Sequence, residues 1–145
     1  MQSIWHICVL AACAASAASN PARLYEITIE TGMPHLEENL RYAITRSRQF
    51  LARNDLGSAF PILDHPSLAG CKLREQQHAE DMLLYVLVCE GSAETTGTAR
   101  WQLGERVIRG TLDVKLGGKN MTLYQRVTGT LIDGCPPAGA SESSG

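Results

Sequence analysis

The fold is decided by the stretch VIRGTLDVKL at residues 107–116. Within it Leu112, Val114 and Leu116 alternate with polar or charged residues. This is the period of a β-strand with one buried apolar face and one solvent-exposed polar face. A strand of this kind needs hydrogen-bonding neighbours and a cover over its apolar face. The surrounding sequence is therefore expected to supply further strands of the same sheet.

Strand-like segments flank this stretch at the spacing of an antiparallel meander. Residues 95–103 precede it and residues 121–131 follow it, and the turn sequences GER (104–106) and GGKN (117–120) lie between them. Residues 81–89 contain the run MLLYVLV, which predicts a strand buried on both faces. The chain is expected to be mainly β: a single antiparallel meander sheet, curled or partly closed into a barrel-like shape.

The first half of the chain is less uniform. Residues 24–30 alternate apolar and polar side chains and predict a first strand. Residues 36–54 carry apolar residues at helical spacing, and Glu37 and Arg41 form an i,i+4 pair, so the pattern favours a helix. Residues 40–49 also fit an extended segment. The sheet is expected to be accompanied by at most a short helix in the middle of the chain.

Residues 1–17 are predicted to be an export signal, because an apolar run and an alanine-rich stretch precede the first charged residue, Arg23. The signal is too short to remain as a membrane-spanning helix. Ala15-Ser16-Ala17 fits ordinary signal cleavage, whereas residues 10–13 read LAAC and resemble a bacterial lipobox, in which Cys13 would carry a lipid. In either case the protein is expected outside the reducing cytosol.

The rest of the chain is expected to form one domain. Residues 18–135 are long enough for one modest core, and the Pro-, Gly- and Ser-rich residues 136–145 predict a disordered tail. The formal net charge of −2 predicts neither nucleic-acid binding nor a polyanionic partner. No apolar run after residue 20 is long enough to cross a membrane, so membrane attachment is expected only through a lipid on Cys13.

Three cysteines follow the export signal: Cys71, Cys89 and Cys135. If residues 76–80 turn, the segment after Cys71 runs back beside the strand that ends at Cys89, and the two cysteines come close across the pair. We therefore predict a Cys71–Cys89 disulfide, which would close a loop of roughly 18 residues. Cys135 would then remain a free thiol.

Short sequence markers follow one another in a characteristic order. They are Cys71, residues 85–89 (YVLVC), 96–99 (TGTA), 108–112 (IRGTL), 121–123 (MTL) and 132–135 (IDGC). Residues 24–28 (LYEIT) open the domain, with Tyr25 at a position where Trp is common. In these markers the chain resembles an uncharacterised family of short exported bacterial proteins, known only as a domain of unknown function.

The resemblance implies a mostly antiparallel β domain, a periplasmic or outer-membrane location, and no established activity. It also implies that the second element is extended, so we expect a strand over residues 40–49 in place of a helix. The family has a cysteine close after this strand, where this chain has Phe50. The missing cysteine would leave Cys135 without a partner, either inert beneath the tail or joining two chains in a dimer.

The sequence shows no catalytic constellation. His35 lies near Glu37 and Glu38, but their spacing matches no established metal site, and solvated loop residues explain them better. His65 and His78 also fall in expected loops. The chain has no Gly-x-Ser-x-Gly elbow and no Gly-x-x-x-x-Gly-Lys phosphate loop. We expect no catalytic residue, no metal site and no cofactor.

Arg46 and Arg48 are the candidate anion-binding residues. They share a face if residues 40–49 are extended, and no acidic residue lies between Glu38 and Asp55. Phosphates of lipopolysaccharide, an anionic lipid or an acidic partner would suit them. Charge protection of a sheet edge explains the two arginines equally well.

The expected function is that of a non-enzymatic cell-envelope protein, a binding or accessory module in the periplasm or on the outer membrane. Its partner would be an unknown envelope protein or a small ligand, and the protein would be a monomer or a dimer linked through Cys135. One alternative is a small lipocalin-like carrier with an apolar ligand inside a curled sheet. A less favoured alternative is a metal-dependent hydrolase built on His35, Glu37 and Glu38.

Overall fold

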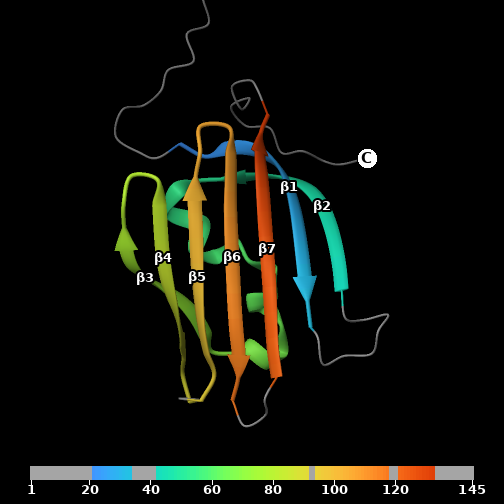
Figure 1. Cartoon of the computed structure of the whole chain (residues 1–145), viewed down its shortest axis with the longest axis vertical. Helices are drawn as coiled ribbons and strands as arrows, with labels where there is room; N and C mark the ends of the chain where they lie inside the picture. Colours follow the sequence, from blue (N-terminus) through green and yellow to red (C-terminus); the bar gives the residue numbers. More distant parts are fainter. Residues whose placement is uncertain (1–20, 34–41, 92–93, 118–120, 133–145) are drawn as a thin grey trace, which may run out of the picture.

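The computed structural model describes residues 21–33, 42–91, 94–117 and 121–132. They form one antiparallel sheet of seven strands in the order β2-β1-β7-β6-β5-β4-β3 (Figure 1). The strands are β1 (Arg23–Gly32), β2 (Tyr42–Leu51), β3 (Cys71–His78), β4 (Met82–Cys89), β5 (Thr96–Leu103), β6 (Val107–Leu116) and β7 (Met121–Leu131). The prediction of a mainly β chain with a single antiparallel sheet is confirmed. The sheet is not closed into a barrel, since β2 and β3 are its two edges.

The strand order makes the chain cross the sheet once. Strands β3 to β7 follow one another as a meander, and β1 then lies between β7 and β2. The chain therefore has to pass from β2 at one edge to β3 at the other. Residues 52–70, which we call the crossing connection, do so on one face of the sheet, behind the strands in Figure 1. They contain three short 3-10 segments: η1 (Arg53–Ser58), η2 (Pro61–Asp64) and η3 (Pro66–Leu68).

Strand β2 confirms the extended interpretation of the middle of the chain. All ten residues of Tyr42–Leu51 pair with β1, so the helix that the apolar spacing favours is wrong for these residues. Residues 34–41 lie outside the described part of the chain. The pattern misleads because β2 is not half-buried: Thr45 and Ser47 share a face with the buried residues of β1 and are nevertheless exposed. The strand therefore lacks an apolar alternation.

The core lies between the sheet and the crossing connection. Alternate strand residues are buried on this inner face. Four buried side chains of the connection belong to the same cluster: Leu56, Phe60, Ile62 and Leu68. Trp101 is fully buried, with its ring centroid 5.4 Å from that of Phe60. Its partner on β6, Gly110, provides the necessary room, because a Cβ there would lie 2.7 Å from the indole ring.

Two side chains of the sheet hold the backbone of the crossing connection. The Trp101 indole N–H donates to the carbonyl oxygen of Leu56 at 3.0 Å. The side-chain oxygen of Gln125 accepts from the Ile62 N–H at 3.2 Å, and its NH2 group donates to the Thr31 hydroxyl at 2.8 Å. Gln125 is the only buried polar side chain among the described residues. These bonds give partners to the buried indole N–H, to the side chain of Gln125 and to the Ile62 N–H.

Strand β4 is buried on one face only, which corrects the prediction for residues 81–89. Leu83 and Leu87 point into the core, whereas Val86 and Val88 are each 38% exposed on the other face. The run MLLYVLV is apolar throughout, so its composition does not distinguish the two faces. Within the described residues, the crossing connection covers one side of the sheet and leaves the other to solvent.

The hairpin of β3 and β4 carries the disulfide. Cys71 and Cys89 are directly opposite each other with their Cα atoms 3.9 Å apart, and they are bonded as predicted. The turn is shorter than the expected residues 76–80, because β3 continues to His78 after a bulge that precedes Gln77. The other cysteines, Cys13 and Cys135, lie outside the described residues, as do the expected export signal and tail.

Replacement of both bridged cysteines, C71A/C89A, is expected to lower the free energy of unfolding by about 3 kcal/mol, because the bridge restricts the unfolded chain. Urea denaturation of the variant and of the wild type measures the difference, with reduced wild type as a second sample. A non-reducing peptide map in which Cys135 is joined to Cys71 or Cys89 would contradict the pairing.

Gln125→Leu is expected to destabilise the fold by about 1–3 kcal/mol, because Leu leaves the Ile62 N–H and the Thr31 hydroxyl without their partner. Gln102→Leu is the matched control, since Gln102 is exposed on the opposite face of the sheet. Equal unfolding midpoints of the two variants would show that Gln125 does not hold the crossing connection.

Candidate functional site

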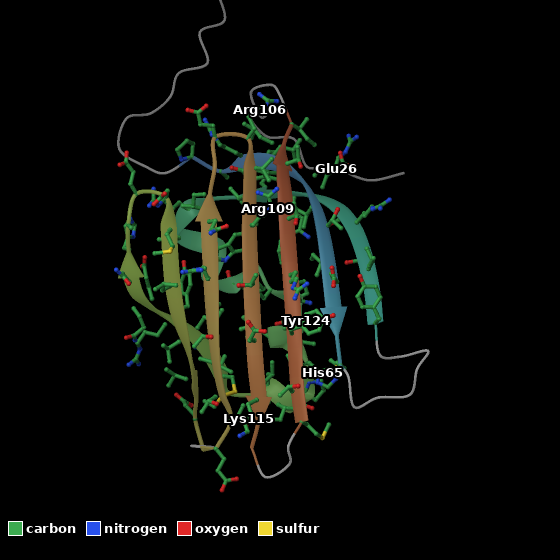
Figure 2. All side chains as sticks on the ribbon, viewed as in Figure 1. Glu26, His65, Arg106, Arg109, Lys115 and Tyr124 are labelled. Atoms are coloured by element: carbon green, nitrogen blue, oxygen red, sulfur yellow. A yellow bond between two sulfur atoms is a disulfide. The ribbon has the colours of Figure 1, made fainter. Side chains whose placement is uncertain are left out.

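The candidate functional site is the outer face of the sheet, which we define as the face turned away from the crossing connection. In each strand, the residues between the buried ones point to this face. The register aligns them in rows across the strands: Asp113 on β6 lies between Thr98 on β5 and Tyr124 on β7. Figure 2 shows Arg109 and Lys115 along β6.

Basic residues are concentrated on the outer face. Eight basic side chains point to it, and all are exposed: Arg46, Arg48, Lys72, Arg74, Arg100, Arg109, Lys115 and Arg126. Three acidic side chains accompany them: Glu26, Glu30 and Asp113. The strands thus give this face a formal charge of +5, although the whole chain carries −2. The net charge of the chain does not reveal that basic residues are concentrated on one face, because it does not depend on which residues share a surface.

Three of the arginines form a compact group on the central strands, the arginine triangle of Arg100, Arg109 and Arg126. Arg100 and Arg126 stand on either side of Thr111 in one row, and Arg109 is diagonal to both. Diagonal neighbours in a sheet are about 7–8 Å apart, so long side chains at these positions reach a common ligand. Guanidinium groups bind phosphate and carboxylate in a bidentate manner, which suits the triangle to anions.

Arg46 and Arg48 point to the outer face of β2, beside Thr28 and Glu26 of β1. The two candidate anion-binding residues therefore do share a face. Among the described residues, only Arg126 of the eight basic side chains lies within ion-pair distance of a carboxylate, with its Nη1 3.9 Å from Glu30 Oε1. The other seven cations make no such pair within that part of the chain.

Exposed apolar side chains lie on the same face as the cations. Tyr42, Ile44 and Phe50 on β2 are 51%, 52% and 41% exposed, and Val86 and Val88 on β4 accompany them. These five are the exposed large hydrophobic residues of the described chain, and each points outward because it lies in a row with outward residues of a neighbouring strand. The outer face therefore joins cations with apolar groups, the combination typical of an interaction surface.

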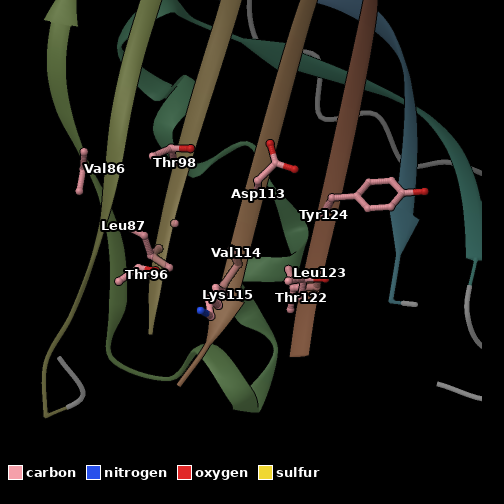
Figure 3. Close-up of a pocket in the computed structure, with 11 residues that line it drawn as sticks. Val86, Leu87, Thr96, Thr98, Asp113, Val114, Lys115, Thr122, Leu123 and Tyr124 are labelled. Carbon is pink, nitrogen blue, oxygen red and sulfur yellow. The ribbon is translucent and has the colours of Figure 1, made fainter. Parts of the chain in front are cut away.

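A groove of about 630 Å³ crosses the outer face (Figure 3). Its walls are two rows of side chains, with Val86, Thr98, Asp113 and Tyr124 in one row and Thr96, Lys115 and Thr122 in the other. The lining supplies hydroxyl groups, one carboxylate and one ammonium group, and Leu87, Gly97, Val114 and Leu123 complete it. It contains no cysteine or histidine. The groove therefore combines groups that can form hydrogen bonds with an apolar surface.

Glu30 is the centre of a polar cluster beside the groove. The Tyr124 hydroxyl donates to Glu30 Oε1 at 3.5 Å, and the Arg126 guanidinium lies 5.0 Å from the centre of the Tyr124 ring in a cation–π contact. The Tyr124 ring covers Gly32, where any Cβ would collide with it. Tyr42 lies on the other side of Gly32. Partial desolvation raises the pKa of Tyr42, and the charge and hydrogen bonding of Glu30 raise it further.

A second pocket, of about 260 Å³, lies beside Arg53 at one end of the inner face. The Arg53 guanidinium donates to the carbonyl oxygen of Ala79, which ties the crossing connection to the turn before β4. Its Nε is buried without a partner among the described residues. Burial raises the pKa of Tyr85. The charge of Glu75 raises this pKa further, whereas the charge of Arg53 lowers it. Arg53 thus serves the fold.

The histidines in the described chain make local contacts. His65 Nδ1 accepts from the Ser67 N–H at 3.1 Å, and His78 Nδ1 lies 2.8 Å from Glu75 Oε1. His78 ends strand β3 and is not in a loop as expected. The predicted weak metal ligands lie outside the described residues: His35, Glu37 and Glu38. Within the described ranges, no three His, Cys, Asp or Glu side chains gather as metal ligands do, and no helix is long and apolar enough to span a membrane.

Comparison with known proteins gives no match, since no family model, no curated protein and no solved structure is similar to the chain. The resemblance to exported bacterial proteins of unknown function stays a prediction. The function is therefore inferred from the outer face itself.

Part of this surface is recognisable in the sequence. Arg46 and Arg48 are predicted as a pair because they are two residues apart on one segment. The arginine triangle is not predicted, because its three members come from three strands and meet only through the register. The available signal is one arginine at a solvent-facing position in each of the three expected strands at residues 95–103, 107–116 and 121–131.

The pKa of Tyr42 is expected to lie above that of an ordinary tyrosine, and Glu30→Gln is expected to lower it, because the substitution removes a carboxylate that opposes the phenolate charge. Spectrophotometric titration measures the change, with Tyr42→Phe subtracted in each background to isolate this residue. A Tyr42 pKa that is the same with Glu30 and with Gln at that position would contradict the contact.

Proposed function

We propose that the protein is an exported, non-enzymatic binding module of the cell envelope, which attaches to phosphate-rich membrane surfaces through the outer face of its sheet. The observation that carries the proposal is the separation of charge: eight exposed basic side chains against three acidic ones on a face of an otherwise acidic chain. Lipid phosphates are the anions that this face would meet at a bacterial membrane.

The electrostatic part of the attachment depends on how many cations reach the phosphates. Each Lys or Arg near an anionic membrane contributes about 1 kcal/mol, and the attraction falls off within a Debye length of about 8 Å at physiological salt. Arg46 and Arg48 are well placed for contact because they lie on the edge strand β2. The arginine triangle adds attraction from the centre of the face.

The apolar part of the attachment comes from the same strand. Tyr42 and Ile44 precede the two arginines and Phe50 follows them, all on the outer side of β2. Aromatic and aliphatic side chains that flank cations are suited to the boundary between headgroups and acyl chains. Strand β2 thus supplies both kinds of contact that peripheral attachment needs.

The predicted export signal at residues 1–17 is compatible with this role. A lipid on Cys13 would tether the domain to a membrane, and stable anchoring takes two signals, such as one acyl chain and a basic patch. The outer face would be the second signal. A domain that is cleaved after residue 17 would rely on the face alone and bind reversibly.

The carrier alternative has less support from the structure. It needs an apolar cavity inside a curled sheet, whereas the inner face holds the buried side chains of the crossing connection. The apolar groups that remain available to a ligand are on the outer face. A surface-binding role therefore fits the described residues better than an enclosed ligand.

Arg46→Glu/Arg48→Glu is expected to weaken binding to phosphatidylglycerol vesicles by at least about thirtyfold, which corresponds to about 2 kcal/mol for two lost cation contacts. Vesicle co-sedimentation in low salt measures the partition coefficient, and raised salt should weaken binding of the wild type. Phosphatidylcholine vesicles should bind neither protein.

The matched control compares single reversals, Arg46→Glu and Arg23→Glu. They change the net charge equally, but Arg23 lies at the start of β1 and does not point to the outer face. Only Arg46→Glu should weaken vesicle binding substantially. Equal binding by the wild type and the double variant would refute the proposed function.

A further inference from the structure

We infer that the free edge of β2 is a site for β-strand addition, and that its partner is an extended segment with two acidic residues spaced i and i+2. In β-strand addition, a segment of another protein pairs with the open edge of a sheet through backbone hydrogen bonds. The inference concerns the backbone of β2 and goes beyond the membrane attachment proposed above.

The direction of the backbone groups follows from one hydrogen bond. The Ile132 N–H donates to the Leu24 carbonyl oxygen at 2.9 Å, so the backbone groups of Leu24 point to β7. Those of the next residue, Tyr25, point the opposite way to β2, where its partner is Gln49. Gln49 therefore directs its N–H and C=O to β1. Arg48, one residue away, directs its N–H and C=O to the open edge.

This alternation continues along β2 because its register with β1 is unbroken over ten pairs. The residues whose backbone groups face the open edge are Tyr42, Ile44, Arg46, Arg48 and Phe50. They are also the residues whose side chains point to the outer face. An added strand would therefore place its own side chains directly beside Arg46 and Arg48 on that face.

The two edges of the sheet are built differently. Strand β3 has eight residues, a bulge that precedes Gln77 and a disulfide at its first residue, features that hinder the addition of another strand. Strand β2 has ten residues without proline, glycine or a bulge, and nine of them are not buried. Among the described residues, no strand other than β1 pairs with it. Within the described part of the chain, β2 is therefore the open edge.

Strand β1 shows which residues suit a neighbour of β2. On the outer face it places Glu26 beside Arg48 and Leu24 beside Phe50. Opposite charges and apolar pairs directly across two strands are favourable, whereas like charges are not. A segment on the open side would satisfy the same rule with acidic residues opposite Arg46 and Arg48 and apolar residues at the ends.

A second copy of this chain does not fit that rule. Antiparallel pairing of β2 with its copy over the whole strand places Arg46 opposite the same arginine of the copy. The next register places Arg46 opposite Arg48 twice. Both arrangements bring like charges together at the centre of the interface. The two arginines thus disfavour self-pairing and favour an acidic partner.

The probe for this site is a nine-residue peptide, Val-Thr-Glu-Thr-Glu-Thr-Val-Thr-Val, blocked at both ends and carrying a fluorophore. In antiparallel pairing its two glutamates lie opposite Arg48 and Arg46, and threonines lie on the inner side. The control peptide has lysine in place of both glutamates. Fluorescence anisotropy with the full chain, without membranes, is expected to show saturable binding of the acidic peptide and at least tenfold weaker binding of the basic one.

Two variants separate the backbone from the side chain. Ile44→Pro removes an N–H that faces the open edge and leaves the ladder to β1 intact, whereas Ile44→Ala removes the same side chain but keeps the N–H. Ile44→Pro is expected to bind the acidic peptide at least tenfold more weakly than Ile44→Ala. Thr45→Pro is expected to lower stability instead, because the Thr45 N–H faces β1.

The outcomes distinguish this inference from the proposed function. Equal peptide binding by Ile44→Pro and Ile44→Ala overturns strand addition, and so does the absence of saturable binding up to about 1 mM peptide. Both variants lack the Ile44 side chain, so their vesicle binding is compared with each other and not with the wild type. The two variants are expected to bind vesicles equally, because membrane attachment does not use the edge N–H. Concentration-dependent dimerisation that Ile44→Pro abolishes would assign the edge to a second copy and overturn the acidic partner.

Discussion

The crossing connection is the constraint on which the rest of the structure depends. Because β2 and β3 occupy opposite edges, the residues between them have to cross the whole sheet. They cross on the inner face, and their buried side chains supply the second layer that a single sheet lacks. Trp101 and Gln125 hold the backbone of this layer, so its position is set by directional bonds as well as by apolar contact.

The outer face does not pack against the crossing connection, and its amino-acid composition differs accordingly from that of the inner face. In the described part of the chain no segment packs on it, so its side chains need not be apolar or of fixed volume. A face that only had to be soluble would mix charges of both signs. Eight cations against three anions make a field of a single sign, which attracts anionic ligands. This charge supports the proposed function in binding.

How much the sequence predicts depends on the range of the interactions. Leu112, Val114 and Leu116 reveal their strand because alternation is local, and Cys71 meets Cys89 because a hairpin joins them. Predictions fail where burial depends on distant segments. The run MLLYVLV has two similar faces, and only the place of the crossing connection decides which one is buried.

The candidate site shows the same limit. Arg46 and Arg48 are recognisable as a pair because they lie two residues apart in one strand. The arginine triangle takes one residue from each of three strands, so it exists only once the register is known. The net charge of the chain does not indicate the triangle, since acidic residues elsewhere in the chain outnumber the excess basic residues of the outer face.

The two surfaces inferred for β2 are linked through Arg46 and Arg48. An acidic strand at the open edge would place carboxylates beside these arginines on the outer face, and their positive charge would then be partly neutralised. Lipid phosphates would meet a weaker field, so the bound strand would lower the affinity for the membrane. Because the two binding equilibria are thermodynamically linked, membrane binding would lower the affinity of the protein for the strand by the same factor. Such a protein would release the membrane when it captures its partner, although no residue outside β2 would have to move.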